Sequence, residues 1–194
     1  MMAKEKKQKQ TDFQFNTEDY VLYILKKIPY EKSTPLVINK IAFLTEFAYK
    51  FKTFKDLTDI EYAAIDYGPV INNYKKLFKK MSNEGKIEYI GEKHLSPKQD
   101  PQTETPEHIK AVIDQLIEHY SRMDVGELIT LTHKTDSYII TTEGQKKIMS
   151  NIIDKDLTHL DTIIFGGNEL ESLPEVDLDA LPVINKAELV KYEF

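Results

Sequence analysis

The chain has 194 residues, 41% of them hydrophobic, and a net charge of −6, which allows one compact domain with a core, or one domain with a tail. It has no cysteine, which excludes a disulfide scaffold and thiolate metal sites and fits a reducing compartment. No apolar stretch has the length of a membrane-spanning helix, and none follows the lysine-rich N-terminus as a secretory signal requires. We therefore expect a cytoplasmic protein without a membrane partner.

The charge is distributed unevenly along the chain. Residues 1–16 carry four lysines against two acids, a net of +2, whereas residues 151–194 carry ten acids against three lysines, a net of −7. The region between them is close to neutral. The first segment is polar with little to bury, and glycines and prolines interrupt the last. We therefore predict a disordered lead at 1–16, a folded domain at 17–155 and an acidic extension at 156–194.

Six segments combine a helical spacing of apolar residues with capping signals. The second of them is apolar on most sides, which is typical of a helix in the centre of a domain. It opens with Thr34-Pro35, a capping residue followed by a proline in the first turn. In chain order, the predicted helices cover residues 17–28, 34–48, 74–84, 105–120, 124–133 and 142–153.

Two short regions, residues 62–66 and 87–96, favour a small two- or three-stranded β element. Between them, Gly68-Pro69 indicates a turn or the start of a helix. The predicted fold class is therefore mainly α (α+β): a compact domain of five to six helices with a small β-hairpin or sheet, plus the acidic C-terminal extension.

The sequence offers few residues for catalysis or metal binding. It has five histidines, none paired with another histidine or a carboxylate at a known metal-ligand spacing. The nucleophile-elbow, P-loop and dinucleotide-binding glycine motifs are absent from the sequence, and glycine is scarce. We therefore expect no catalytic residue, no metal and no cofactor, and we expect a protein that is not an enzyme.

Two motifs stand out, each with a structural explanation. The first is Tyr67, Gly68, Pro69 and Val70, where the glycine supplies a backbone shape that other residues disfavour. The second is Thr132 and His133, where a histidine near a helix C-terminus interacts well with the helix dipole. A catalytic His133 would need an orienting carboxylate and a nucleophile within reach, so a hydrolase or transferase stays an open alternative.

The order of these segments resembles the Panacea domain, a family that includes SocA-like antitoxins and phage-associated proteins. The resemblance covers roughly residues 17–150, and at the place where the family often has a tryptophan this chain has Tyr138. It rests on the ordered set of residues 36–47, 57–62, 67–70, 113–117 and 127–133.

The resemblance implies an antitoxin of a toxin–antitoxin system, which neutralises a co-encoded protein toxin by direct binding. A SocA-like member implies a variant role, as an adaptor that delivers the toxin to a protease. Because the two motifs occur jointly in the family pattern, we expect Gly68-Pro69 and Thr132-His133 to meet in space. In that arrangement His133 would be hydrogen-bonded to the backbone near the Gly68-Pro69 turn.

A DNA-binding transcriptional regulator is the competing function, because small helical domains with a hairpin can resemble winged helices. The near-neutral body and the lack of a visible basic stripe in any one helix count against it, so nucleic acid is not an expected partner. A homo-oligomer stays open.

The acidic tail is the predicted toxin-binding element, because acids steer it toward a basic surface such as the active-site face of a toxin. Interspersed hydrophobic residues would anchor it there. The alternative is that the first three of these anchors pack back on the body. The anchors are Ile163, Ile164, Phe165, Val183 and Ile184.

Overall fold

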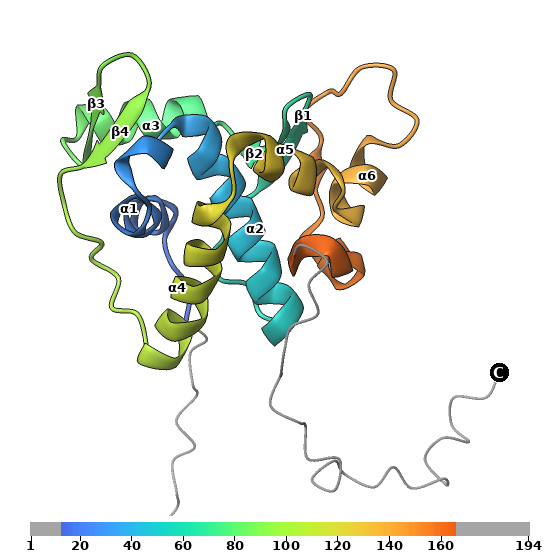
Figure 1. Cartoon of the computed structure of the whole chain (residues 1–194), viewed down its shortest axis with the longest axis horizontal. Helices are drawn as coiled ribbons and strands as arrows, with labels where there is room; N and C mark the ends of the chain where they lie inside the picture. The colour runs from blue at the N-terminus through green and yellow to red at the C-terminus, as the bar shows by residue number, and fades with distance from the viewer. Residues whose placement is uncertain (1–12, 166–194) are drawn as a thin grey trace, which may run out of the picture.

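The computed structural model describes residues 13–165, which form six α-helices and two small antiparallel sheets (Figure 1). This is the compact α+β fold that the sequence predicts. None of the helices in this range is long and apolar enough to cross a membrane. The helices are α1 (Thr17–Lys27), α2 (Pro35–Thr53), α3 (Tyr74–Asn83), α4 (Glu107–Arg122), α5 (Val125–His133) and α6 (Asp136–Thr142). The strands are β1 (Tyr62–Ile65), β2 (Gly68–Ile71), β3 (Ile87–Ile90), β4 (His94–Pro97) and β5 (Ile152–Ile153).

Helix α2 is the centre of the domain, as its sequence predicts. Every residue from Val37 to Tyr49 is buried, and the helix contacts α1, α4, α5 and β2. Thr34 caps its first turn by accepting from the amide of Val37, with Pro35 in the first turn. In Figure 1 the helix runs through the middle of the molecule, between α1 and α6. Side chains on all sides of α2 are therefore available to hold neighbouring elements.

The N-terminal boundary of the folded body lies earlier than predicted. Asn16, rather than Thr17, caps α1, because its side chain accepts from the amide of Asp19. Phe15 is buried in the core and forms an isolated parallel bridge with Thr58. Residues 13–16 therefore belong to the body, and the rest of the predicted disordered lead lies outside the described residues.

Strands β1 and β2 form a hairpin with β5 on its outer side, in the order β2-β1-β5. Of the two predictions for Gly68-Pro69, the turn is correct and the helix start is wrong, since Gly68–Ile71 is a strand of a tight hairpin and α3 begins at Tyr74. Pro69 is tolerated because β2 is an edge strand of this sheet.

The predicted helix at 142–153 is also wrong. Helix α6 ends at Thr142, and Gly144, at a φ of +69°, follows in a conformation that no helix interior has. Ile152 and Ile153 then pair with β1 instead, which covers an otherwise open strand edge and buries Ile153.

A second hairpin, β3–β4, follows α3 directly and packs against it. After β5, the chain forms two 3-10 turns, η2 (Lys155–Leu160) and η3 (Thr162–Phe165), which pack on α2, α5 and α6. The folded body therefore continues about ten residues past the predicted boundary at 155.

Candidate functional site

The Tyr67-Gly68-Pro69-Val70 motif lies at the turn of the first hairpin. Asp66 and Tyr67 form the two-residue loop, and Ile65 pairs with Gly68 across it. Gly68 has a φ of +85°, which side chains disfavour. A Cβ at this position would also lie 2.8 Å from Lys40 Nζ and 2.9 Å from Thr132 Oγ1. Both the backbone angle and the close contacts therefore require glycine.

Three side chains from three different helices reach the backbone of this turn. Lys40 of α2 donates to the carbonyl oxygen of Pro69 at 3.0 Å, and the hydroxyl of Tyr138 of α6 donates to that of Ile65 at 2.8 Å. The Nε2 of His133, at the end of α5, lies 3.1 Å from the carbonyl oxygen of Asp66. We call Lys40, His133 and Tyr138 the turn clamp, because together they fix the backbone on both sides of Tyr67.

Lys40 is the least expected member of the turn clamp, since its side chain is fully buried. Burial lowers the pKa of Lys40 to about 7, because a charged ammonium loses its hydration inside the protein. The neighbouring Asn39 strengthens the same connection, as its side chain accepts from the amide of Ile71 at 2.8 Å. Two adjacent residues of α2 thus hold strand β2 at its carbonyl and amide groups.

His133 is engaged on both ring nitrogens. Its Nδ1 lies 2.7 Å from the carbonyl oxygen of Ile129, and its Nε2 faces that of Asp66. Carbonyl oxygens only accept, so each nitrogen meets an acceptor and neither meets a carboxylate or a nucleophile. Thr132, which is buried, donates its hydroxyl to the same Ile129 carbonyl at 2.9 Å. The geometry suits bracing of the turn and does not supply the partners of a general base.

The structure thus brings Gly68 and Pro69 together with Thr132 and His133, as expected from their joint occurrence. Tyr138 contributes as well, since its ring meets the His133 ring edge-on at a centroid distance of 4.9 Å. Gly68, Pro69 and Val70 are buried.

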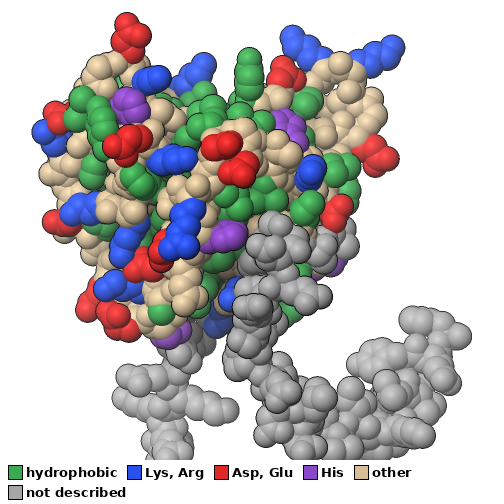
Figure 2. All heavy atoms as spheres, viewed as in Figure 1, with side chains coloured by type: hydrophobic (Ala, Val, Ile, Leu, Met, Phe, Trp, Pro, Cys, Tyr) green, Lys and Arg blue, Asp and Glu red, His purple; other side chains and the backbone are tan. Residues whose placement is uncertain are grey.

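Tyr67 differs from the rest of its motif, because 68% of it is exposed. It lies beside an open groove of about 540 Å³. The lining of this groove includes Leu36, Ile65, Val70, Tyr74, Val125 and one charged residue, Lys93. Figure 2 shows hydrophobic side chains reaching the surface at this hairpin end of the molecule. We call Tyr67 with this groove the Tyr67 face.

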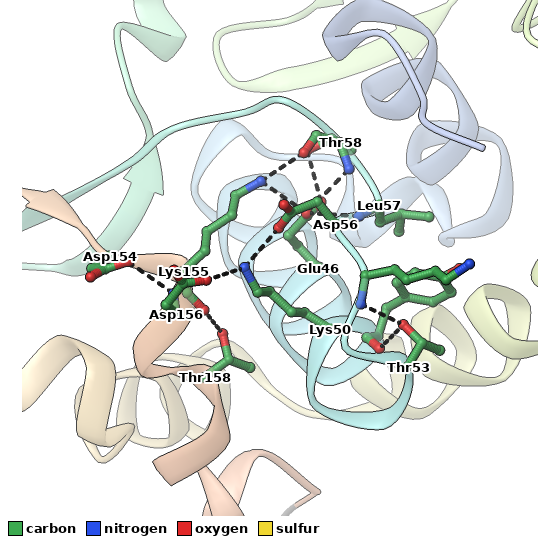
Figure 3. A network of polar contacts seen from close by, with 12 residues as sticks. Glu46, Lys50, Thr53, Asp56, Leu57, Thr58, Asp154, Lys155, Asp156 and Thr158 are labelled. Atoms are coloured by element: carbon green, nitrogen blue, oxygen red, sulfur yellow. Dashed lines mark hydrogen bonds and ion pairs between the residues drawn. The ribbon is translucent and has the colours of Figure 1, made fainter. Parts of the chain in front are cut away.

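A second polar network ties the C-terminal segment to α2 (Figure 3). Glu46 is completely buried and accepts from the amides of Leu57 and Thr58, from the Thr58 hydroxyl and, at 2.9 Å, from Lys155 Nζ. Lys155 also donates to the carbonyl of Thr58 at 2.8 Å. Burial raises the pKa of Glu46, and the contact with Lys155 opposes this shift. Through these hydrogen bonds, Lys155 fixes the start of η2 against α2.

The proposed tail anchors divide into two groups. Ile164 is completely buried, and its carbonyl oxygen accepts from the hydroxyl of Tyr120 at 2.7 Å, whereas Ile163 is partly buried against the core. The alternative prediction, in which this segment packs back on the body, is therefore correct for Ile163 and Ile164. Phe165 ends η3 and is the last described residue. Val183 and Ile184 lie outside the described residues.

Lys40 and Glu46 are the site residues that sequence reasoning missed. Each is a charged residue on α2, a helix that is apolar on most sides. A charged residue in such a helix indicates a buried side chain with polar partners. Among residues 13–165, no group of three or more histidine and carboxylate side chains is placed to hold a metal ion.

A family model for the antitoxin SocA-like, Panacea domain matches residues 38–138, just over half of the chain. The chain belongs to this family. The matched part of the Panacea domain begins before Lys40 and ends at Tyr138, so it contains the whole turn clamp together with Tyr67. No curated protein and no solved structure matches the chain. Membership of an antitoxin family is consistent with a role other than catalysis.

Proposed function

We propose that this Panacea domain neutralises a co-encoded protein toxin by binding it directly, and that the Tyr67 face is the docking surface. The observation that carries the proposal is the contrast within one motif. Gly68 and Pro69 are buried and are held by the turn clamp. Tyr67, which directly precedes them in the chain, is exposed to solvent. An aromatic side chain exposed on a rigid turn is a typical anchor of a protein interface.

Rigidity of the turn supports this role energetically. Binding costs free energy when it orders a mobile loop, and a loop that is already fixed avoids that cost. Here the backbone on both sides of Tyr67 is held by donors from α2 and α6 and lies against the His133 ring at the end of α5. The groove beside it offers apolar surface from Leu36 and Val125, against which an apolar side chain of the toxin would pack.

The acidic tail is a second proposed element of the interface. Residues 166–194 carry seven acids against two lysines, a composition that would steer the protein toward a toxin with a basic active-site face. The body and the tail would then contribute differently, with the Tyr67 face supplying apolar anchoring and the tail supplying long-range attraction.

Catalysis through His133 is the alternative that the geometry supports least. Both ring nitrogens face backbone carbonyls rather than a nucleophile, and the neighbouring Thr132 hydroxyl is bonded within its own helix. A general base needs a free ring nitrogen facing a substrate or nucleophile.

The proposal is tested by co-expressing the tagged full chain with the product of the adjacent gene. We expect the two proteins to co-purify in a fixed ratio and the chain to restore growth of cells that express that product. If the adjacent product is toxic and is neutralised without forming a complex, direct binding is wrong. If Tyr67→Ala co-purifies and protects as well as the wild type, the function stands and the Tyr67 face is not the docking surface.

A further inference from the structure

Helix α3 has two faces of opposite character. Phe78 and Met81 are buried on the inner face, with Tyr74 and Leu77 partly buried beside them. The outer face consists of lysines at relative positions i, i+1, i+4 and i+5, which places them in two adjacent rows on one side of the helix. All four are exposed: Lys75, Lys76, Lys79 and Lys80.

Acidic neighbours engage only the C-terminal end of this row. Lys80 lies 2.7 Å from Glu18 and also faces Glu84, and Lys86 pairs with the same two carboxylates. Lys75, Lys76 and Lys79 form no ion pair with any residue between 13 and 165, although Asp59 and Glu61 line a groove with Lys76. Three lysines of one helix face therefore remain available for an external anion.

The β3–β4 hairpin places one more lysine near this surface, next to the exposed Glu92 of the same loop. Its loop carries Lys93, which lines a groove together with Tyr74, the residue that begins α3. Tyr74 also lines the adjoining groove with Lys75 and Lys76, so the lysines of the hairpin and of the helix are neighbours across Tyr74. Figure 1 places α3 and this hairpin together at one end of the molecule, and Figure 2 shows lysine or arginine side chains along the rim there.

We propose that α3 binds the phosphate backbone of duplex DNA through Lys75, Lys76 and Lys79. Protein interfaces are depleted of lysine and depend on apolar anchors, whereas the outer face of α3 presents lysines without an apolar residue between them. Like charges repeated along a helix match a ligand with regularly repeated negative charge. We name DNA rather than duplex RNA because a helix fits the mouth of the B-form major groove, where lysines reach the phosphates that border it, whereas the A-form major groove is too narrow.

This inference does not depend on the proposed toxin binding, and it revises the sequence-based expectation that nucleic acid is not a partner. That expectation rested on the near-neutral charge of the whole body and on the absence of a basic stripe. The stripe is present on α3, where the apolar residues between the lysines face inward. A local surface charge, rather than the net charge, is what a phosphate backbone meets.

The test measures binding of the purified full chain to fluorescently labelled 20-base-pair duplexes by anisotropy at 50 and 200 mM salt. With three phosphate contacts, we expect affinity to fall about 40-fold between the two salt concentrations. Lys75→Glu/Lys79→Glu should reduce the affinity at 50 mM salt at least about tenfold. Lys110→Glu/Lys134→Glu, which changes the net charge equally on other elements, should reduce it by less than about threefold.

Unchanged circular dichroism and melting temperature of both variants show that folding is not the cause. Absence of DNA binding by the wild type at 50 mM salt would overturn the proposal. An equal loss in both variants would also overturn it, because it would indicate attraction by net charge alone. Binding of an RNA duplex of the same sequence as tightly as DNA would overturn the assignment to a DNA groove.

Discussion

The buried ammonium of Lys40 donates to the carbonyl oxygen of Pro69 at 3.0 Å, across 29 positions of sequence. This contact joins the central helix to the strand that follows the exposed Tyr67. It places an ionisable group inside the core, at a site where His133 and Tyr138 hold the neighbouring carbonyls. Changes at this turn, which we propose as the docking site, should therefore alter the free energy of unfolding of the domain.

The pH dependence of stability should reveal Lys40. Unfolded lysine keeps its proton up to about pH 10.5, whereas folded Lys40 loses it near pH 7, so the unfolded state binds more protons between these values. The free energy of unfolding of the wild type should therefore rise with pH, relative to Lys40→Met, by up to about 1.4 kcal/mol per pH unit. Urea unfolding of both proteins between pH 7 and 9.5 measures this difference. Parallel pH profiles would show that Lys40 is not desolvated.

Gly68→Ala should destabilise the domain by about 3 kcal/mol, because it combines a strained backbone angle with contacts to Lys40 and Thr132 that are too close. Gly85→Ala is the matched control, since Gly85 also has a positive φ but nothing lies within 4 Å of an added Cβ. That control should cost only about 1 kcal/mol. Chemical denaturation of both variants separates the close contacts from the backbone strain. Equal costs would mean that the turn is not packed against the two helices.

His133→Ala should lower stability by about 1–2 kcal/mol, because it removes the ring that lies between the carbonyl oxygens of Ile129 and Asp66 and packs on Tyr138. Tyr138→Phe, which loses the donor to Ile65, should cost about 1 kcal/mol. Both variants should still neutralise the toxin at a temperature where they are folded, with a lower affinity because the Tyr67 turn is held less rigidly. Loss of neutralisation by a fully folded His133→Ala protein, with Tyr138→Phe active, would instead indicate a chemical role for His133.

Truncation separates the body from the acidic tail. A chain that ends at residue 165 keeps the Glu46–Lys155 pair and the buried Ile164, so its melting temperature should equal that of the full chain. A chain that ends at residue 155 loses the burial of Asp161 and Ile164 and should melt many degrees lower. Differential scanning calorimetry tests both. If the shorter chain is as stable as the longer one, η2 and η3 are not part of the body.

The helices were predictable because their signals are local. Thr34-Pro35 and Asp124 mark helix starts by capping, and the spacing of apolar residues gives the buried faces. The helix expected at 142–153 was wrong because the spacing of Ile148, Ile152 and Ile153 also suits a helix. Ile152 and Ile153 form a strand because the edge of β1 is free to pair with them, and the spacing of apolar residues does not reveal that edge.

The turn clamp could be predicted only in part. The motif order predicted that His133 would meet the Gly68-Pro69 turn, but nothing local indicated that Lys40 would enter the core and donate there. Such contacts depend on how three helices and a hairpin pack. The lysine row of α3 was missed at the level of sequence, because the lysines form a separate outer face only when Phe78 faces inward.

The affinity of the purified chain for the adjacent gene product, measured by calorimetry, tests the central claim most directly. Tyr67→Ala should weaken binding at least about 30-fold, as expected for an anchor worth 2 kcal/mol or more. Phe54→Ala removes an even more exposed aromatic at the far end of α2 and should change the affinity less than about twofold. Equal affinities of the wild type and Tyr67→Ala would contradict the account.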